Sequence, residues 1–119
     1  MDENEIIRKH LALDGIIEKA LADGDFRANN RAAKELMALF RTVSANRALA
    51  ERVYCCLLKE SCPRTQAHAA SECLRMGIYI QEAEQILEKL ARREDIGITA
   101  LGAEYTLKVW RGEISGKSL

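Results

Sequence analysis

The chain has 119 residues, enough for one domain with its own core, and its 48% hydrophobic and 30% charged residues are typical of a globular rather than a disordered protein. Its 18 basic and 18 acidic residues give a net charge of zero, which argues against a globally basic nucleic-acid-binding protein. The acidic start, Met1 to Glu5, and the lack of an apolar run of about 20 residues predict a cytoplasmic protein without a signal peptide or membrane span.

The composition predicts helix almost throughout, because only one proline and few glycines interrupt the helix-forming residues. The first predicted helix opens near Asp2 or Asn4 and ends near residue 23. Its apolar stripe is Ile6, His10, Leu13, Ile17 and Ala20. The second predicted helix has Asp25 as its cap. Its apolar stripe is Phe26, Ala33, Met37 and Phe40. The third begins near Ser44 or Asn46. It carries Leu49, Val53, Cys56 and Leu57.

The C-terminal half predicts three more helices. Pro63 suits the first position of the fourth helix and Gly77 its end. The apolar stripe of the fourth helix is Ala67, Ala70 and Leu74. The fifth helix, over roughly 80–93, presents Ala83, Ile86, Leu87 and Leu90. The sixth, capped by Asp95, presents Ala100, Ala103, Leu107 and Trp110. We expect one domain over 1–114 and a flexible tail over 115–119.

An internal repeat links these helices in pairs. The third and fourth helices match the fifth and sixth at an offset of 33 residues, which aligns Val53 with Ile86 and Leu74 with Leu107. The first pair matches the third and fourth at an offset of 37, which aligns Ile16 with Val53 and Met37 with Leu74. Six helices in three equivalent antiparallel hairpins favour an α-solenoid over a plain helical bundle.

Two segments carry a family resemblance: Gly-Asp-Phe-Arg and Asn-Asn-Arg within 24–31, and Ala-Glu, Leu, Trp and Gly-x-Ile at fixed steps within 102–114. Over most of its length the chain resembles the small bacterial HEAT-like family catalogued as domain of unknown function two thousand and nineteen. The middle helices, with Cys55, Cys56 and Cys62, match less well. The resemblance implies a HEAT-like α-solenoid of three stacked hairpins, whose second helices line a concave surface, and no established activity. Similar families include partner-binding scaffolds and toxin-immunity proteins.

No residue pattern indicates catalysis or a cofactor. The two histidines lie far apart in the sequence, and no phosphate-binding loop or nucleophile elbow is present. His10 lies on an apolar stripe and is interpreted as a buried histidine with a partner. Glu104, near Tyr105 and Trp110, is interpreted as a surface ion pair with Lys108, four residues on. We therefore expect a protein that is not an enzyme.

The cysteines and the tryptophan also have structural explanations. Cys55, Cys56, Cys62 and Cys73 are interpreted as reduced thiols. Adjacent Cys55 and Cys56 point to different sides of a helix, which does not suit zinc, and no metal site is expected. Trp110 continues the apolar series of the last helix and is interpreted as a core residue.

The second helix of each predicted hairpin has a mostly basic polar side. The candidate partner-binding residues are Arg27, Arg31, Lys34, Arg64, His68, Arg75, Lys108 and Arg111, with Arg41 on the same side. Most acidic residues lie on the first helices of the hairpins, so a net charge of zero is compatible with a basic concave face. Such a face would steer an acidic partner toward it and bind less tightly as salt rises. A solvated surface with an incidental bias is the alternative interpretation.

The hypothesis that follows is a non-catalytic protein-binding module of the adaptor or toxin-immunity type. The alternative is binding to the nucleic-acid backbone by the same ridge, with arginines on phosphates. Few aromatic residues are available to stack on the bases of single strands. The last helix also carries Ile98, Leu101 and Tyr105 away from its main stripe, which could pack against a second copy of the chain.

Overall fold

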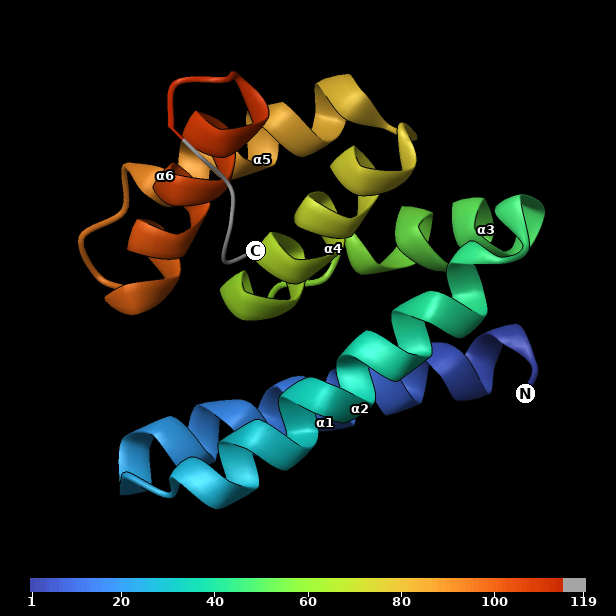
Figure 1. Ribbon diagram of the computed structural model, residues 1–119, viewed down its shortest axis with the longest axis horizontal. Coiled ribbons are helices and arrows are strands. Elements are labelled where there is room, and N and C mark those ends of the chain that lie inside the picture. The colour runs from blue at the N-terminus through green and yellow to red at the C-terminus, as the bar shows by residue number, and fades with distance from the viewer. Residues whose placement is uncertain (115–119) are drawn as a thin grey trace. The chain divides into compact units, whose positions relative to one another are not determined.

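The computed structural model describes residues 1–114, and this part of the chain is all-α with six helices (Figure 1). They are α1 (Glu3–Asp23), α2 (Phe26–Ser44), α3 (Arg47–Leu57), α4 (Pro63–Met76), α5 (Ile80–Ala91) and α6 (Ile98–Trp110). The predicted flexible tail, 115–119, lies outside the described residues. None of the described helices is both long and apolar enough to cross a membrane. The chain divides into two compact units, Met1–Leu57 with α1 to α3 and Leu58–Leu119 with α4 to α6.

Most helix ends lie where the capping residues predict them. The Asp2 side chain accepts a hydrogen bond from the backbone N–H of Glu5 at 2.8 Å, and Asp25 accepts one from Ala28 at 3.1 Å. Each carboxylate satisfies one of the N–H groups that the first turn of a helix leaves unpaired. Asn46 does the same for α3, accepting from the N–H of Leu49 at 3.1 Å.

The predicted cap of the sixth helix is wrong. α6 begins after Gly97, and the Asp95 carboxylate instead accepts two hydrogen bonds from the Arg93 guanidinium, at 2.9 and 2.7 Å. A two-point bond between charged groups is stronger than a single bond to a neutral backbone N–H. The helix begins two residues further along than a cap at Asp95 would place it, with Gly97 at the N-cap position and Asp95 bound to Arg93.

In the first unit, the predicted stripe of α1 is confirmed, because Ile6, His10, Leu13, Ile17 and Ala20 are all buried. The predicted stripe of α2 is wrong, since Phe26 is 74% exposed and Met37 is 55% exposed. The buried residues of α2 are Ala32, Leu36, Leu39 and Val43. α2 has apolar residues on two neighbouring sides, and packing against α1 buries the side that forms a cluster with Leu13 and Ile17.

The residues chosen to define the repeat in the first hairpin therefore include exposed ones. Ile16 was aligned with Val53, yet Ile16 is 48% exposed and Val53 is buried. Keeping the 37-residue offset and moving one position along aligns Ile17 with Tyr54, both of which are buried. At this offset the burial of Ile17 and Tyr54 matches, whereas the burial of Ile16 and Val53 does not. α3 also departs from prediction at Cys56, which is exposed.

In the second unit, α5 packs against both α4 and α6. The buried residues of α5 are Ala83, Leu87 and Leu90, and those of α6 are Ala100, Ala103 and Leu107, all of them predicted. Trp110 is a correction, because it is 42% exposed rather than a core residue. It is the last residue of α6, one turn beyond Leu107, and lies at the edge of the buried side rather than on it.

Candidate partner-binding surface

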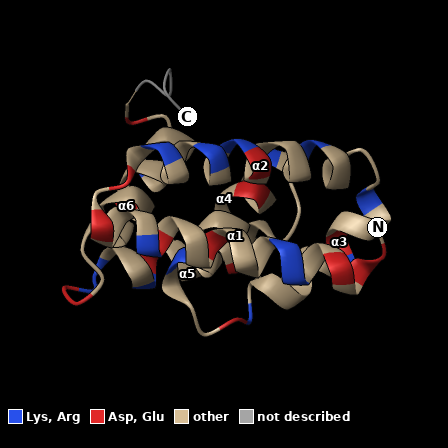
Figure 2. Cartoon of the chain, turned by 90° about the horizontal axis from the view of Figure 1, so that it is seen from below, with Lys and Arg blue, Asp and Glu red and all other residues tan. Residues whose placement is uncertain are grey.

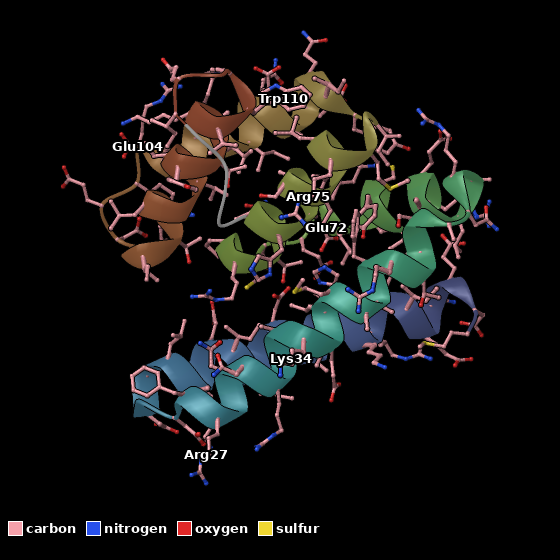
Figure 3. The ribbon with its side chains drawn as sticks, viewed as in Figure 1. Arg27, Lys34, Glu72, Arg75, Glu104 and Trp110 are labelled. Atoms are coloured by element: carbon pink, nitrogen blue, oxygen red, sulfur yellow. The ribbon has the colours of Figure 1, made fainter. Side chains whose placement is uncertain are left out.

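Four cations form one exposed row along α2, which we name the α2 basic stripe: Arg27, Arg31, Lys34 and Arg41. Steps of four, three and seven residues keep these side chains on one side of a helix with 3.6 residues per turn. With a rise of 1.5 Å per residue, the row extends about 21 Å. Figure 2 shows Lys and Arg segments recurring along α2, and Figure 3 shows Arg27 reaching away from it.

The α2 basic stripe has little internal compensation. No carboxylate among residues 1–114 lies within ion-pair distance of its four cations, and α2 contains a single acidic residue, Glu35. Arg27 is in the first turn, which has no acidic residue, so its charge meets the positive end of the helix dipole. Like charges one turn apart, as at Arg27 and Arg31, repel each other. The N-terminal part of the stripe is thus unfavourable for the isolated helix, whereas Arg41 lies in the last turn, where a cation is favourable.

Two exposed apolar side chains adjoin the α2 basic stripe. Phe26 and Met37 lie on the neighbouring side of α2, and both extend into solvent. Exposed aromatic and methionine side chains are enriched in protein interfaces. Sequence reasoning assigned them to the core and so missed them as surface residues. One feature of the sequence could have indicated their exposure: α2 has more apolar residues than a single buried stripe can hold.

The predicted residues of α4 are less accessible. Arg64 and His68 are half-buried, while Arg75 is exposed near the end of the helix (Figure 3). Each of the three already makes a hydrogen-bonding, ring or electrostatic contact within the chain. Binding a partner through these residues would compete with the existing contacts, whereas the α2 basic stripe has none to lose.

The two predicted residues of α6 are engaged in ion pairs. Lys108 Nζ lies 3.2 Å from Glu104 Oε1, as the four-residue spacing predicts. Arg111 follows the last turn of α6 and binds both Glu84 and Glu88 of α5. Its hydrogen bonds, above all the one to Glu88, raise the pKa of Arg111 above its ordinary value. Arg111 therefore ties the end of α6 to α5.

The structure brings the predicted residues together only in part. Those of α4 and α6 belong to one unit, in which the two helices are in contact, and those of α2 belong to the other unit. The joined ridge across all three helices stays a prediction. The α2 basic stripe does not depend on it, because its four residues lie on one helix.

One buried polar pair has the residue types of a catalytic centre. His10 Nδ1 lies 3.0 Å from Asp14 Oδ2, and the two side chains are 3% and 1% exposed. Both side chains are too deeply buried to reach a ligand in solvent. The pair is therefore part of the core of the first unit. Among residues 1–114, no three His, Cys, Asp or Glu side chains are grouped to hold a metal ion, and none of the four cysteines there forms a disulfide bond.

Comparison with known proteins identifies no relative of this chain. The chain matches no family model, no curated protein sequence and no solved structure.

Proposed function

We propose that this protein is a non-catalytic binding module whose α2 basic stripe engages an acidic surface of another protein. The observation that carries the proposal is the row of four exposed cations with no carboxylate within ion-pair distance among the described residues. An adaptor and a toxin-immunity protein are two roles that such a module would fill, since neither requires catalysis.

The shape of the stripe defines the acidic surface that fits it. A row of about 21 Å along one helix matches a partner helix of four turns or an equally long acidic edge. Phe26 and Met37 add apolar contacts beside the cations. We therefore propose a partner whose carboxylates flank at least one apolar side chain.

The cations and the apolar side chains would contribute different amounts to the binding free energy. Exposed ion pairs contribute about 0.2–1 kcal/mol each, so four of them alone give weak binding. Burying one large apolar side chain contributes about 1.5–3 kcal/mol. The cations would therefore mainly accelerate the encounter and select acidic partners, while Phe26 and Met37 supply much of the affinity.

A pull-down from source cells tests the proposal. The stripe variant carries Arg27→Glu, Arg31→Glu and Arg41→Glu, and the matched control carries Arg8→Glu, Lys9→Glu and Lys19→Glu on the exposed side of α1. Both variants change the net charge equally. We expect an acidic protein that is recovered with wild type and control, is lost with the stripe variant, and elutes as salt is raised.

Two outcomes would contradict the proposal. Equal recovery with both variants would show that the α2 basic stripe is not the binding surface. Nucleic acid recovered by wild type and control and lost by the stripe variant, measured by absorbance at 260 nm, would instead assign the stripe to the phosphate backbone.

A further inference from the structure

A second surface lies on α6, on the side opposite its buried residues. Ile98 is 64% exposed and Leu101 is 66% exposed, while Tyr105 and Val109 are half-buried. Steps of three and four residues place these four side chains, which we name the α6 outer face, in one row. The helix is therefore apolar on two opposite sides, although only the side of Ala100, Ala103 and Leu107 is buried in the unit. Contiguous apolar patches on a protein surface are common at interaction sites, and this row is the candidate patch of α6.

The charged residues at the edge of the α6 outer face indicate which partner binds there. α6 has two charged residues, Glu104 and Lys108, one turn apart on the same edge of the outer face. If two copies of α6 pair antiparallel about a two-fold axis near Thr106, Glu104 of each copy lies beside Lys108 of the other. A parallel two-fold pair would place the two charged edges on opposite sides of the contact, where they do not meet. The edge is thus complementary to itself in the antiparallel arrangement alone.

We propose that the chain forms a homodimer through antiparallel pairing of the α6 outer faces. The same register brings Leu101 of one copy toward Val109 of the other and the two Tyr105 side chains toward each other. The contact involves one helix from each copy and is smaller than a standard protein interface. The dimer therefore forms at high protein concentration and dissociates on dilution.

Sedimentation equilibrium of the full chain, from about 5 to 500 µM, tests the proposal. Wild type should shift from monomer to dimer over this range, and Leu101→Glu should stay monomeric. Ile16→Glu is the matched control, because Ile16 is a similarly exposed aliphatic residue on α1, and it should dimerise like wild type. Circular dichroism checks that each variant keeps its helices.

Charge variants test the register. Glu104→Lys and Lys108→Glu should each shift dimerisation to at least tenfold higher concentration, because like charges then face each other. A mixture of the two variants should form a heterodimer at wild-type concentrations. Wild type that stays monomeric to 500 µM, or a dimer that survives Leu101→Glu, would overturn the proposal. Single charge variants that dimerise like wild type would overturn the antiparallel register.

Discussion

His10 and Asp14 show how much depends on one residue in a small core. They lie one turn apart on the buried side of α1, with a 3.0 Å contact between their side chains. A buried polar group is tolerated when it has a partner and costs free energy when the partner is removed. The position of His10 on an apolar stripe predicted this environment, while the geometry of its contact with Asp14 comes from the structure.

Removing the Asp14 carboxylate should therefore destabilise the protein. We expect Asp14→Ala to lower the free energy of unfolding by about 3 kcal/mol, measured by urea denaturation, because it leaves His10 buried without this contact. Asp23→Ala is the control, since Asp23 is exposed at the end of α1 and its loss should change stability by less than about 0.5 kcal/mol. Equal effects would mean that the pair contributes nothing specific.

Two glycines of the first unit should respond to alanine in opposite directions. Gly24 ends α1 with a φ of 71°, and Gly15 lies within the helix, yet neither position has an atom within 4 Å of an added Cβ. Gly24→Ala should cost about 1 kcal/mol, because a Cβ is strained in the left-handed region. Gly15→Ala should stabilise by up to about 1 kcal/mol through helix propensity. Thermal unfolding of both variants measures the difference.

At the scale of elements, α2 has two apolar sides, and packing against α1 decides which one is buried. Leu36 is 7% exposed and Met37 is 55% exposed, although they are adjacent in the sequence. Helical periodicity is compatible with either side. The side that faces α1 is buried because its residues form a cluster with Leu13 and Ile17. A single-helix pattern does not contain that information.

This assignment predicts unequal effects from neighbouring substitutions. Leu36→Ala should lower the free energy of unfolding by about 3 kcal/mol, because it opens a cavity beside Leu13 and Ile17. Met37→Ala should change it by less than about 0.5 kcal/mol, because Met37 is exposed. Chemical denaturation of the two variants measures both effects. A larger loss of stability for Met37→Ala than for Leu36→Ala would mean that the side predicted from the sequence is the buried one.

The α2 basic stripe should be destabilising in the absence of a partner. Arg31→Glu removes repulsion from Arg27 and Lys34 and places an acidic residue in the N-terminal half of α2. These gains outweigh the new repulsion from Glu35, one turn further along. We expect a gain of about 0.5 kcal/mol in stability together with loss of partner binding. Calorimetry at low salt measures the gain, which should shrink at 1 M salt. A loss of stability would mean that Arg31 has a structural role.

At the scale of the whole molecule, two exposed carboxyl groups, one in each unit, contribute to stability in acid because folding lowers their pKa values. The hydrogen bond from the Glu5 backbone N–H lowers the pKa of Asp2 below its ordinary value of 3.8. The hydrogen bond from Arg93 lowers the pKa of Asp95 below the same value. In each case the folded state holds the proton less tightly than the unfolded state does.

The sign of the pH dependence follows from these shifts. The stabilisation from Asp2 and Asp95 is fully present above pH 3.8 and is lost as the pH falls below 3.8 through the folded pKa values. The double variant Asp2→Asn, Asp95→Asn should therefore lose less stability than wild type between pH 4 and pH 2. Urea denaturation at each pH measures this slope, and a double variant with the wild-type slope would contradict the prediction.

The two proposed surfaces lie on different units of the chain. The α2 basic stripe belongs to the first unit and the α6 outer face to the second. A dimer would carry two basic stripes, and two linked stripes hold a partner with two acidic sites more tightly than one stripe does. Resemblance to a HEAT-like family and the stacking of three hairpins stay predictions.

The amino-acid sequence by itself determined the helical class, most helix ends and the exposed charges. These depend on local physics, because caps such as Asp2, Asp25 and Pro63 and the period of the apolar residues act within one or two turns. The α2 basic stripe could be predicted for the same reason, since four residues on one helix need no tertiary contact to share a side.

Only the tertiary structure decided which of two apolar sides is buried and which carboxylate meets which cation. Phe26 and Met37 are exposed because α1 packs against the other side of α2, and Arg111 is engaged because α5 brings Glu84 and Glu88 to the end of α6. Contacts between residues far apart in the sequence determine which side of a helix is buried and which ion pairs form. The free-energy differences between these alternatives come from the packing of one helix against another. Periodicity within a single helix cannot rank them.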